Sequence, residues 1–351
     1  MNETPFFSIL IPVYNASGTI DRCINAIIQQ NFASFEVVLL DDGSTDESLL
    51  KCQSWQERFP EKIHTIHQEN TGAVYARRNL LNCAKGTYLW FVDADDEISP
   101  DALAELYDIL QKQPVGMLLF DCKTQNAAGN WVHEKQLPDY PKDYLFTPQE
   151  KEILYRYAIQ GNLNSLWNKV FHRKCVDFAA DYSRYKDLKK GNDRLQMLPL
   201  LTNAHHIFYH PKAFYLYYYN PSGLTRTFGQ HTLDSVLTGL DILTEYADQW
   251  TGADQYRKEF ALLRNRHIYQ LLTQAFDACS DNGGFSSFRT YFSIITENKD
   301  LMKDYDFLPL EAIDVYARDV TKTVRTRNVL KCYGVIRVRK ALHWIKEKLM
   351  H

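Results

Sequence analysis

The sequence has few of the features that mark secreted, membrane-spanning or nucleic-acid-binding proteins. Its seven cysteines are scattered and include no Cys-x-x-Cys pair, so we expect no disulfide framework or zinc site, and a reducing cytosol fits best. No apolar run approaches the length of a transmembrane helix. No Lys or Arg precedes the first apolar run, Phe6–Val13, so we expect no signal peptide. A net charge of -3 gives no positive field for nucleic acid.

The chain does contain enough apolar material for a core, since 45% of its 351 residues are hydrophobic. In its first third, strand-like apolar runs alternate with helical patterns. The expected strands are Phe6–Val13, Phe35–Leu40, Lys62–His67, Tyr88–Val92 and Val115–Cys122; the expected helices start with caps at Ser17 and Ser99-Pro100, and span Asp46–Arg58 and Gly72–Ala84. The alternation predicts an α/β fold with a mostly parallel sheet flanked by helices, in which ligands bind beyond the carboxyl ends of the strands.

The remainder of the chain is predicted from local signals. Residues 127–130 suit a hairpin turn, and Thr147-Pro148-Gln149-Glu150 has the pattern of a capping box. Ile207–Tyr219 is rich in aromatic and β-branched residues, which predicts two strands broken at Pro211-Lys212. From His231 onward the apolar spacing is helical. We therefore expect a helical C-terminal region.

Two acidic turns follow expected strands and are candidates for chemistry. Asp93 and Asp95 stand two residues apart after a buried strand and could share one Mg²⁺ or Mn²⁺, because these ions prefer oxygen ligands. Asp42 could accept a hydrogen bond from a nucleobase or a ribose hydroxyl. Taken singly, Asp93 and Asp95 are better explained as a solvated acidic turn, and Asp42 as part of an Asp-Gly turn of the kind that is common after any strand.

Several motifs occur together in a specific order. They are Pro12-Val13-Tyr14-Asn15, Asp41-Asp42-Gly43-Ser44-Thr45-Asp46, Asn70-Thr71-Gly72 with Ala76, Arg77 and Asn79, Gly86-x-Tyr88, and Phe91-Val92-Asp93-Ala94-Asp95-Asp96. This order resembles the family 2 glycosyltransferases of the GT-A fold, closely over residues 6–125. A looser likeness to enzymes that build bacterial surface polysaccharides continues to about residue 228, through Trp167-Asn168-Lys169, Gly191-Asn192-Asp193 and Tyr218 to Arg226.

The resemblance implies roles for individual residues. The donor nucleotide would contact Pro12, Tyr14, Asn15, Asp42, Gly72, Arg77, Asp93 and Ala94. Asp93 and Asp95 would form the DxD motif that binds Mn²⁺ or Mg²⁺, and Asp42 would read the base, most often uracil in this family. Asp193 would be the catalytic base, although Asn192 replaces the first acid of the family's usual Glu-Asp pair. From its position alone, Asp193 could equally be a helix N-cap.

Trp167 could stack on a sugar ring of the acceptor. Lys169 and Arg226 could contact phosphate or the acceptor, although surface ion pairs are the commoner role of such residues. The aromatic run Tyr215, Tyr217, Tyr218 and Tyr219 could stack on sugars, but on a strand only alternate side chains share a face. The resemblance divides the chain into a catalytic domain, 1–228, and a helical region, 229–351. Within the catalytic domain, residues 1–125 would bind the nucleotide sugar and 126–228 would form the acceptor side.

The predicted activity is inverting, metal-dependent transfer of a sugar from a nucleotide sugar, most often a UDP-sugar, to an acceptor hydroxyl in cell-surface polysaccharide synthesis. A sugar-phosphate nucleotidyltransferase is the alternative enzyme, but the turn after Val13 lacks the basic residues that grip a triphosphate. A non-catalytic nucleotide-sugar-binding scaffold is the third interpretation. The resemblance also implies a lipid-linked oligosaccharide as acceptor.

The end of the chain is strongly basic. Residues 318–351 contain ten Lys and Arg but only two acids, a formal charge of +8. Val335, Val338, Leu342, Ile345 and Leu349 among them follow helical spacing. Such a helix could lie on the anionic inner face of a membrane, or its apolar stripe could pack on the helical region.

Overall fold

The structure is a computed structural model that describes residues 4–183, 188, 191–220, 230–280 and 284–349. It forms two compact units: Met1–Leu154 with Asn162–Ser222, and Tyr155–Gly161 with Gly223–His351. The domain boundary predicted at residue 228 lies outside the described residues.

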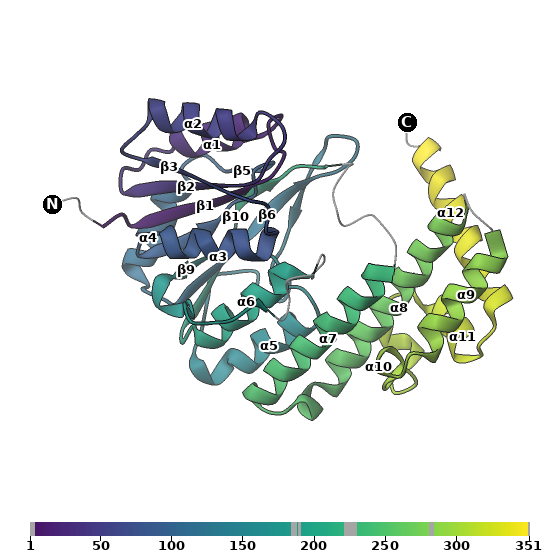
Figure 1. Ribbon diagram of the computed structural model, residues 1–351. Coiled ribbons are helices and arrows are strands. Elements are labelled where there is room, and N and C mark those ends of the chain that lie inside the picture. Colours follow the sequence, from purple (N-terminus) through teal and green to yellow (C-terminus); the bar gives the residue numbers. More distant parts are fainter. Residues whose placement is uncertain (1–3, 184–187, 189–190, 221–229, 281–283, 350–351) are drawn as a thin grey trace. The chain divides into compact units, whose positions relative to one another are not determined.

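The first unit is built on a mixed sheet whose described part has ten strands (Figure 1). Its parallel half has the order β3, β2, β1, β4, and its other half continues with β9, β6, β10 and β5. The strands are β1 (Phe7–Val13), β2 (Phe35–Asp42), β3 (Ile63–Gln68), β4 (Tyr88–Phe91), β5 (Glu97–Ile98), β6 (Met117–Gln125), β7 (Trp131–Glu134), β8 (Tyr144–Phe146), β9 (Lys169–His172) and β10 (Ile207–Tyr217). The predicted α/β class and mostly parallel sheet are confirmed.

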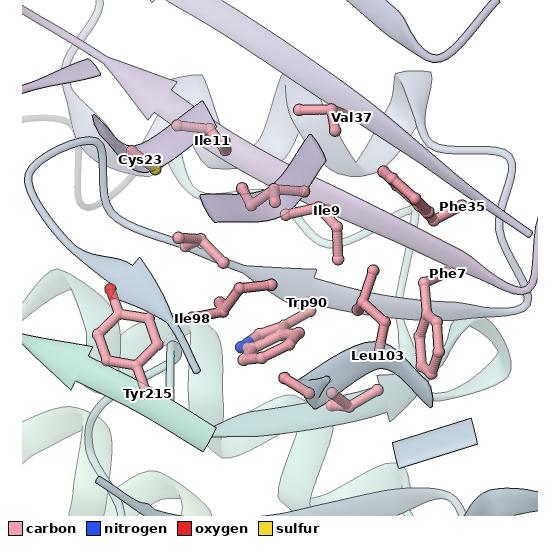
Figure 2. Packing of buried hydrophobic residues seen from close by; sticks show 14 of the residues in the cluster. Phe7, Ile9, Ile11, Cys23, Phe35, Val37, Trp90, Ile98, Leu103 and Tyr215 are labelled. Atoms are coloured by element: carbon pink, nitrogen blue, oxygen red, sulfur yellow. The ribbon is translucent and has the colours of Figure 1, made fainter. Parts of the chain in front are cut away.

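Helices cover both faces of this sheet, with α1 and α2 on one side and α3 on the other (Figure 1). The helices of the first unit are α1 (Ile20–Ile28), α2 (Ser48–Arg58), α3 (Ala73–Cys83), α4 (Ala102–Lys112) and α6 (Asn192–Asn203). Helix α5 (Lys151–Ile159) is divided, because its residues from Tyr155 onward belong to the second unit. Nearly every side chain of β1 is buried, as expected of a strand covered on both faces. Figure 2 shows Phe7 and Ile9 of β1 packed with Trp90 of β4 and Leu103 of α4. This core holds the carboxyl ends of the strands in fixed positions.

Several local predictions are confirmed. Thr147 and Glu150 form the capping box, and Gly129 turns the β6–β7 hairpin with a left-handed φ of 82°. Two predicted helix starts are wrong. The N-cap of α1 is Thr19 rather than Ser17, and α4 follows Asp101, which takes the left-handed conformation, rather than Ser99-Pro100.

The aromatic run after Ile207 is one strand, not two. β10 continues through Pro211, and its pairing with β6 shifts register between His210 and Ala213. A bulge of this kind lets a strand accommodate proline, which cannot donate to the ladder. β9, which pairs antiparallel with both β4 and β6, was not predicted.

The second unit is helical, as predicted for the C-terminal region. It contains α7 (Gln230–Trp250), α8 (Arg257–Ser280), α9 (Gly284–Glu297), α10 (Lys299–Met302), α11 (Arg318–Arg325) and α12 (Val329–Leu349). The rings of Tyr155 and Trp250 stack here with their centroids 3.8 Å apart. None of the described helices is long and apolar enough to cross a bilayer.

Candidate active site

The parallel strands β1, β2 and β4 bring the predicted donor-binding turns to one edge of the sheet. Val13 of β1 is in register with Asp41 of β2, and Leu10 with Phe91 of β4, so the segments after these strands lie together. Asn15 adopts a left-handed φ of 50°, and its side-chain oxygen accepts a hydrogen bond of 2.8 Å from the Thr45 amide. The turns after β1 and β2 are thus joined.

Tyr14 stands at this edge with 53% of its surface exposed, next to the half-buried Pro12. An exposed aromatic ring at the end of a strand is available to contact a ligand. The geometry is therefore compatible with the nucleotide-binding role predicted for both residues.

Asp42 is buried and holds the loop before α3. Its Oδ1 accepts hydrogen bonds from the Gln68 side chain at 2.7 Å and from the Thr71 amide at 2.9 Å. Its Oδ2 accepts one from the Gly72 amide at 2.9 Å. Because each carboxylate oxygen has two lone pairs, Oδ2 retains one acceptor position. Gly72 has φ 88° and precedes α3, so it turns this loop into the helix.

The second acidic turn concentrates negative charge. Burial raises the pKa of Asp93 to about 6, with Asp193 and Asp95 adding to the effect and Arg77 opposing it. Burial and the charges of Asp93 and Asp95 raise the pKa of Asp96 to about 8. Ala94, between the two carboxylates of the DxD motif, is buried. The turn therefore favours a neutralising proton or cation.

Tyr215 of β10 fixes the shape of this turn. Its hydroxyl donates to Asp96 Oδ2 at 2.8 Å and accepts from the Asp93 amide at 3.1 Å. The other Asp96 oxygen accepts from the Tyr218 amide at 2.8 Å, and Asp95 Oδ2 accepts from the Asn220 side chain at 3.1 Å. Asp96 is thus enclosed by protein donors, whereas Asp93 and Asp95 keep more of their acceptor capacity.

Arg77 joins this turn to Asp193. The guanidinium of Arg77, on α3, lies 2.6 Å from Asp193 Oδ1 and 3.7 Å from Asp93 Oδ1. Arg77 is buried, and its Nε has no hydrogen-bond partner among the described residues. The N-cap of α6 is Gly191, so the alternative interpretation of Asp193 as the cap is wrong. The predicted base, the DxD motif and Arg77 thus meet in one place.

The three residues predicted to contact the acceptor or phosphate differ from one another in their placement. Trp167 is half-buried and stacks on Tyr215 with ring centroids 4.6 Å apart, and Tyr217 approaches the same indole at 5.6 Å. Tyr215 and Tyr217 share a face, as their alternation predicted. Lys169 is fully buried and donates to Leu163 O, Ser165 O and Asn168 Oδ1, so its ammonium faces the interior. Arg226 lies outside the described residues.

The model of the family "Glycosyl transferase family 2" matches residues 8–203. The chain belongs to this family. The predicted resemblance is confirmed, and the matched segment contains Asp42, Arg77, the DxD motif and Asp193.

Individual relatives support the family 2 assignment. The chain is 39% identical over 100 residues to the uncharacterized glycosyltransferase YibD of Escherichia coli K12, a match that covers 28% of this chain and 29% of YibD. It is 25% identical over 194 residues to the hyaluronan synthase of Pasteurella multocida, covering 54% of this chain and 19% of that enzyme. The matches therefore span less than a third of the length of both relatives.

Among solved structures, S. aureus TarS (residues 1–349), determined in complex with UDP-GlcNAc, is similar with a TM-score of 0.65. The likeness covers 95% of this chain and 91% of TarS at 19% identity. It supports the GT-A fold that the family 2 resemblance implied.

The donor atoms at the DxD motif of this family 2 chain fit a hard divalent cation. Asp93 and Asp95 offer carboxylate oxygens, which Mg²⁺ and Mn²⁺ prefer. The described residues contain no group of three or more His, Cys, Asp or Glu side chains that could hold a metal ion. Asp93 and Asp95 alone would leave coordination positions for phosphate oxygens and water, which complete many Mg²⁺ sites.

Sequence reasoning missed several side chains that support the site. Arg22 donates to the Asp95 carbonyl, forms an ion pair of 3.0 Å with Glu97 and lies over the ring of Tyr218. No local pattern marks Arg22, because its partners are more than 70 residues away. Asp96 stood in a recognised motif and Tyr215 in the aromatic run, but their hydrogen bond could not be predicted from sequence spacing.

Proposed function

We propose that this chain is an inverting, metal-dependent glycosyltransferase that moves a sugar from a UDP-sugar to an acceptor hydroxyl. The observation that carries the proposal is the position of Arg77, which brings the carboxylates of Asp93 and Asp193 to one guanidinium from segments 100 residues apart in sequence. Donor activation and acceptor deprotonation need groups on both sides of the reacting carbon, and these two carboxylates supply them.

In this proposal each residue has a separate task. Asp193 accepts the proton of the acceptor hydroxyl as that oxygen attacks the anomeric carbon. Arg77 holds Asp193 in position and places a positive charge beside the departing diphosphate. Asp42 accepts a hydrogen bond from the base at the free position of Oδ2, while Tyr14 and Pro12 line the nucleotide pocket. A single displacement inverts the anomeric configuration.

The metal has one role in this scheme. Mn²⁺ or Mg²⁺, when bound by Asp93 and Asp95, would supply the charge that stabilises the leaving nucleoside diphosphate. The negative charge gathered at the second acidic turn supports this assignment. Burial, and after it the neighbouring carboxylates, raise the pKa of Asp93 and Asp96, and a bound cation would favour the ionised forms of these groups.

The acceptor side is proposed from Trp167 and Tyr217, whose rings lie together and are not fully buried. Aromatic faces of this kind stack on sugars. The acceptor would be a lipid-linked oligosaccharide in polysaccharide synthesis, reached from a peripheral position on the inner face of a membrane. The name of one relative, a hyaluronan synthase, and the UDP-GlcNAc complex of TarS are consistent with a polysaccharide product and a uridine donor.

The experiment is a donor screen followed by two matched variants. Purified chain is incubated with Mn²⁺, a lipid-linked saccharide acceptor and a panel of UDP-, GDP- and CDP-sugars. Release of nucleoside diphosphate is measured, and the anomeric configuration of the glycoside product is assigned by NMR. Asp193→Asn should lose turnover on the order of 10²–10⁴-fold while donor affinity stays near wild type. Asp108→Asn, on the exposed face of α4, should behave as wild type. A product that retains the donor's anomeric configuration, or full turnover by Asp193→Asn, would contradict the proposal.

A further inference from the structure

One face of α12 combines exposed apolar side chains with basic residues. Leu330, Val338 and Leu342 are 68%, 59% and 60% exposed. Together with the exposed Gly334 they are spaced by four residues, so they lie along one side of the helix. We call Leu330, Val338 and Leu342, with Lys331 and Arg337 beside them, the α12 face. Exposed apolar residues gathered in this way mark an interaction surface.

The opposite side of α12 is the one that packs within the second unit. Cys332 and Ile336 are buried there, and the ring of Tyr333 contacts those of Phe276 and Phe288 at 4.9 and 5.2 Å. The helix is therefore anchored without the α12 face. Packing of the predicted stripe on the helical region does not occur at Val338 or Leu342, its described exposed members.

The charges on α12 divide in the same way. Arg339 and Lys340 pair with Asp319 and Asp277 and so help to hold the helix in the unit. Lys331 and Arg337 are exposed, and neither makes an ion pair with a described residue. Two of the ten basic residues of 318–351, Lys331 and Arg337, thus stand on the α12 face without an acidic partner among the described residues.

We propose that the α12 face docks the enzyme on an anionic lipid surface. An apolar stripe bordered by Lys and Arg is the arrangement with which a helix lies in the headgroup layer, its apolar side chains entering the lipid and its cations meeting lipid phosphates. The positive face complements the negative surface, whereas the rest of the chain is net acidic. The benefit of docking rests on the proposed function, since it would keep the enzyme where lipid-linked acceptors are found.

The test is sedimentation of the full chain with vesicles in the absence of donor. Wild type should pellet with vesicles of phosphatidylglycerol and phosphatidylcholine and stay in solution with phosphatidylcholine alone. High salt should release it, because dissolved ions shorten the screening length from about 10 Å at 0.1 M to about 3 Å at 1 M. Lys331→Gln with Arg337→Gln should weaken binding about 30-fold, since each basic residue near an anionic surface contributes about 1 kcal/mol. Val338→Asp with Leu342→Asp should abolish it.

Matched controls separate the α12 face from the general surface. Leu50→Asp removes a side chain that is 66% exposed on α2, and Lys112→Gln with Lys142→Gln removes two exposed cations elsewhere. Both controls should bind vesicles as wild type does. Because every substituted position on α12 is exposed, the variants should keep the melting temperature of wild type.

The outcomes also distinguish this inference from the proposed function. The α12 variants should retain donor hydrolysis in solution, and Asp95→Ala should retain vesicle binding. The inference is wrong if wild type does not bind anionic vesicles, or if both α12 variants bind these vesicles as tightly as the control variants do. It is equally wrong if light scattering finds a dimer that Val338→Asp with Leu342→Asp converts to a monomer while no form binds vesicles, because the face would then join two copies of the chain.

Discussion

Asp42→Asn tests both roles assigned to the first acidic turn. The aspartate accepts hydrogen bonds from Gln68, Thr71 and Gly72 and is proposed to accept another from the nucleobase. Asparagine keeps the shape but replaces one acceptor oxygen by a donor NH₂. The Thr71 amide donates to one carboxylate oxygen and the Gly72 amide to the other. Whichever way the asparagine amide turns, its NH₂ group therefore faces one of these two backbone N–H groups.

The cost of this clash can be bounded from the contacts. A buried donor that loses its acceptor costs about 1–3 kcal/mol. For a folding unit of this size, each kcal/mol lowers the melting temperature by about 2–4 °C, so a decrease of roughly 2–12 °C is expected. Asp108→Asn, an exposed helical aspartate, is the matched control and should change neither stability nor binding.

The variant should also change which base is preferred. Uracil presents an N–H at its Watson–Crick edge, which a carboxylate accepts, whereas cytosine presents a bare nitrogen that can accept from an asparagine NH₂. Calorimetric titration with UDP and with CDP, each with Mn²⁺, should show the UDP preference of wild type fall about tenfold or more in Asp42→Asn. A lower melting temperature with an unchanged UDP-to-CDP ratio would mean that Asp42 only holds the loop. An unchanged melting temperature would refute the hydrogen-bond argument itself.

The remaining predictions concern the metal, the backbone and a buried lysine. Asp95→Ala should abolish transfer and weaken UDP binding in Mn²⁺ far more than in EDTA; equal losses under both conditions would argue against a metal ligand. Gly86→Ala should destabilise the first unit by about 1–3 kcal/mol in urea unfolding, because a Cβ at this position would lie 2.5 Å from the Ser8 amide nitrogen. Gly18→Ala is the control and should not produce this loss, because a Cβ there would meet open space. Burial lowers the pKa of Lys169 to about 7 from its ordinary 10.5, so between these pH values the unfolded chain binds more protons than the folded chain and stability rises with pH. Lys169→Met should remove that rise, which is measured as the wild-type-minus-variant difference in unfolding free energy at pH 7 and pH 9.

The parts of the fold that sequence predicted are those encoded by local patterns. β1 and β2 are continuous apolar runs, and the capping box at Thr147 needs only four consecutive residues. β9 was not predicted because it has only four residues and includes a buried lysine. It forms only by pairing with β4 and β6, which come from earlier in the chain. Lys169 was expected near phosphate because the carbonyl oxygens that accept hydrogen bonds from its ammonium in the interior cannot be recognised from its position in the sequence.

Proline and capping signals failed where tertiary structure outweighed them. Pro211 reads as a strand end, yet the bulge opposite β6 lets β10 continue and carry Tyr215 to the acidic turn. The start of α4 moved to Asp101 because residues 97–98 pair with β10 first, and Ser99 donates its amide to the Phe214 carbonyl. Both errors lie beside the second acidic turn, where long-range contacts set the backbone.

The two acidic turns looked alike in sequence but differ in how their charge is balanced. At the first, backbone amides and Gln68 surround Asp42, so its charge is compensated within the protein and its position is fixed. At the second, Asp93, Asp95 and Asp96 repel one another, and a single guanidinium, that of Arg77, is shared between Asp93 and Asp193. A protein keeps such unbalanced charge only at some cost in stability, and a bound cation would offset that cost. This difference supports the proposed roles, in which the compensated turn recognises a neutral base and the uncompensated turn binds a metal and the donor's diphosphate.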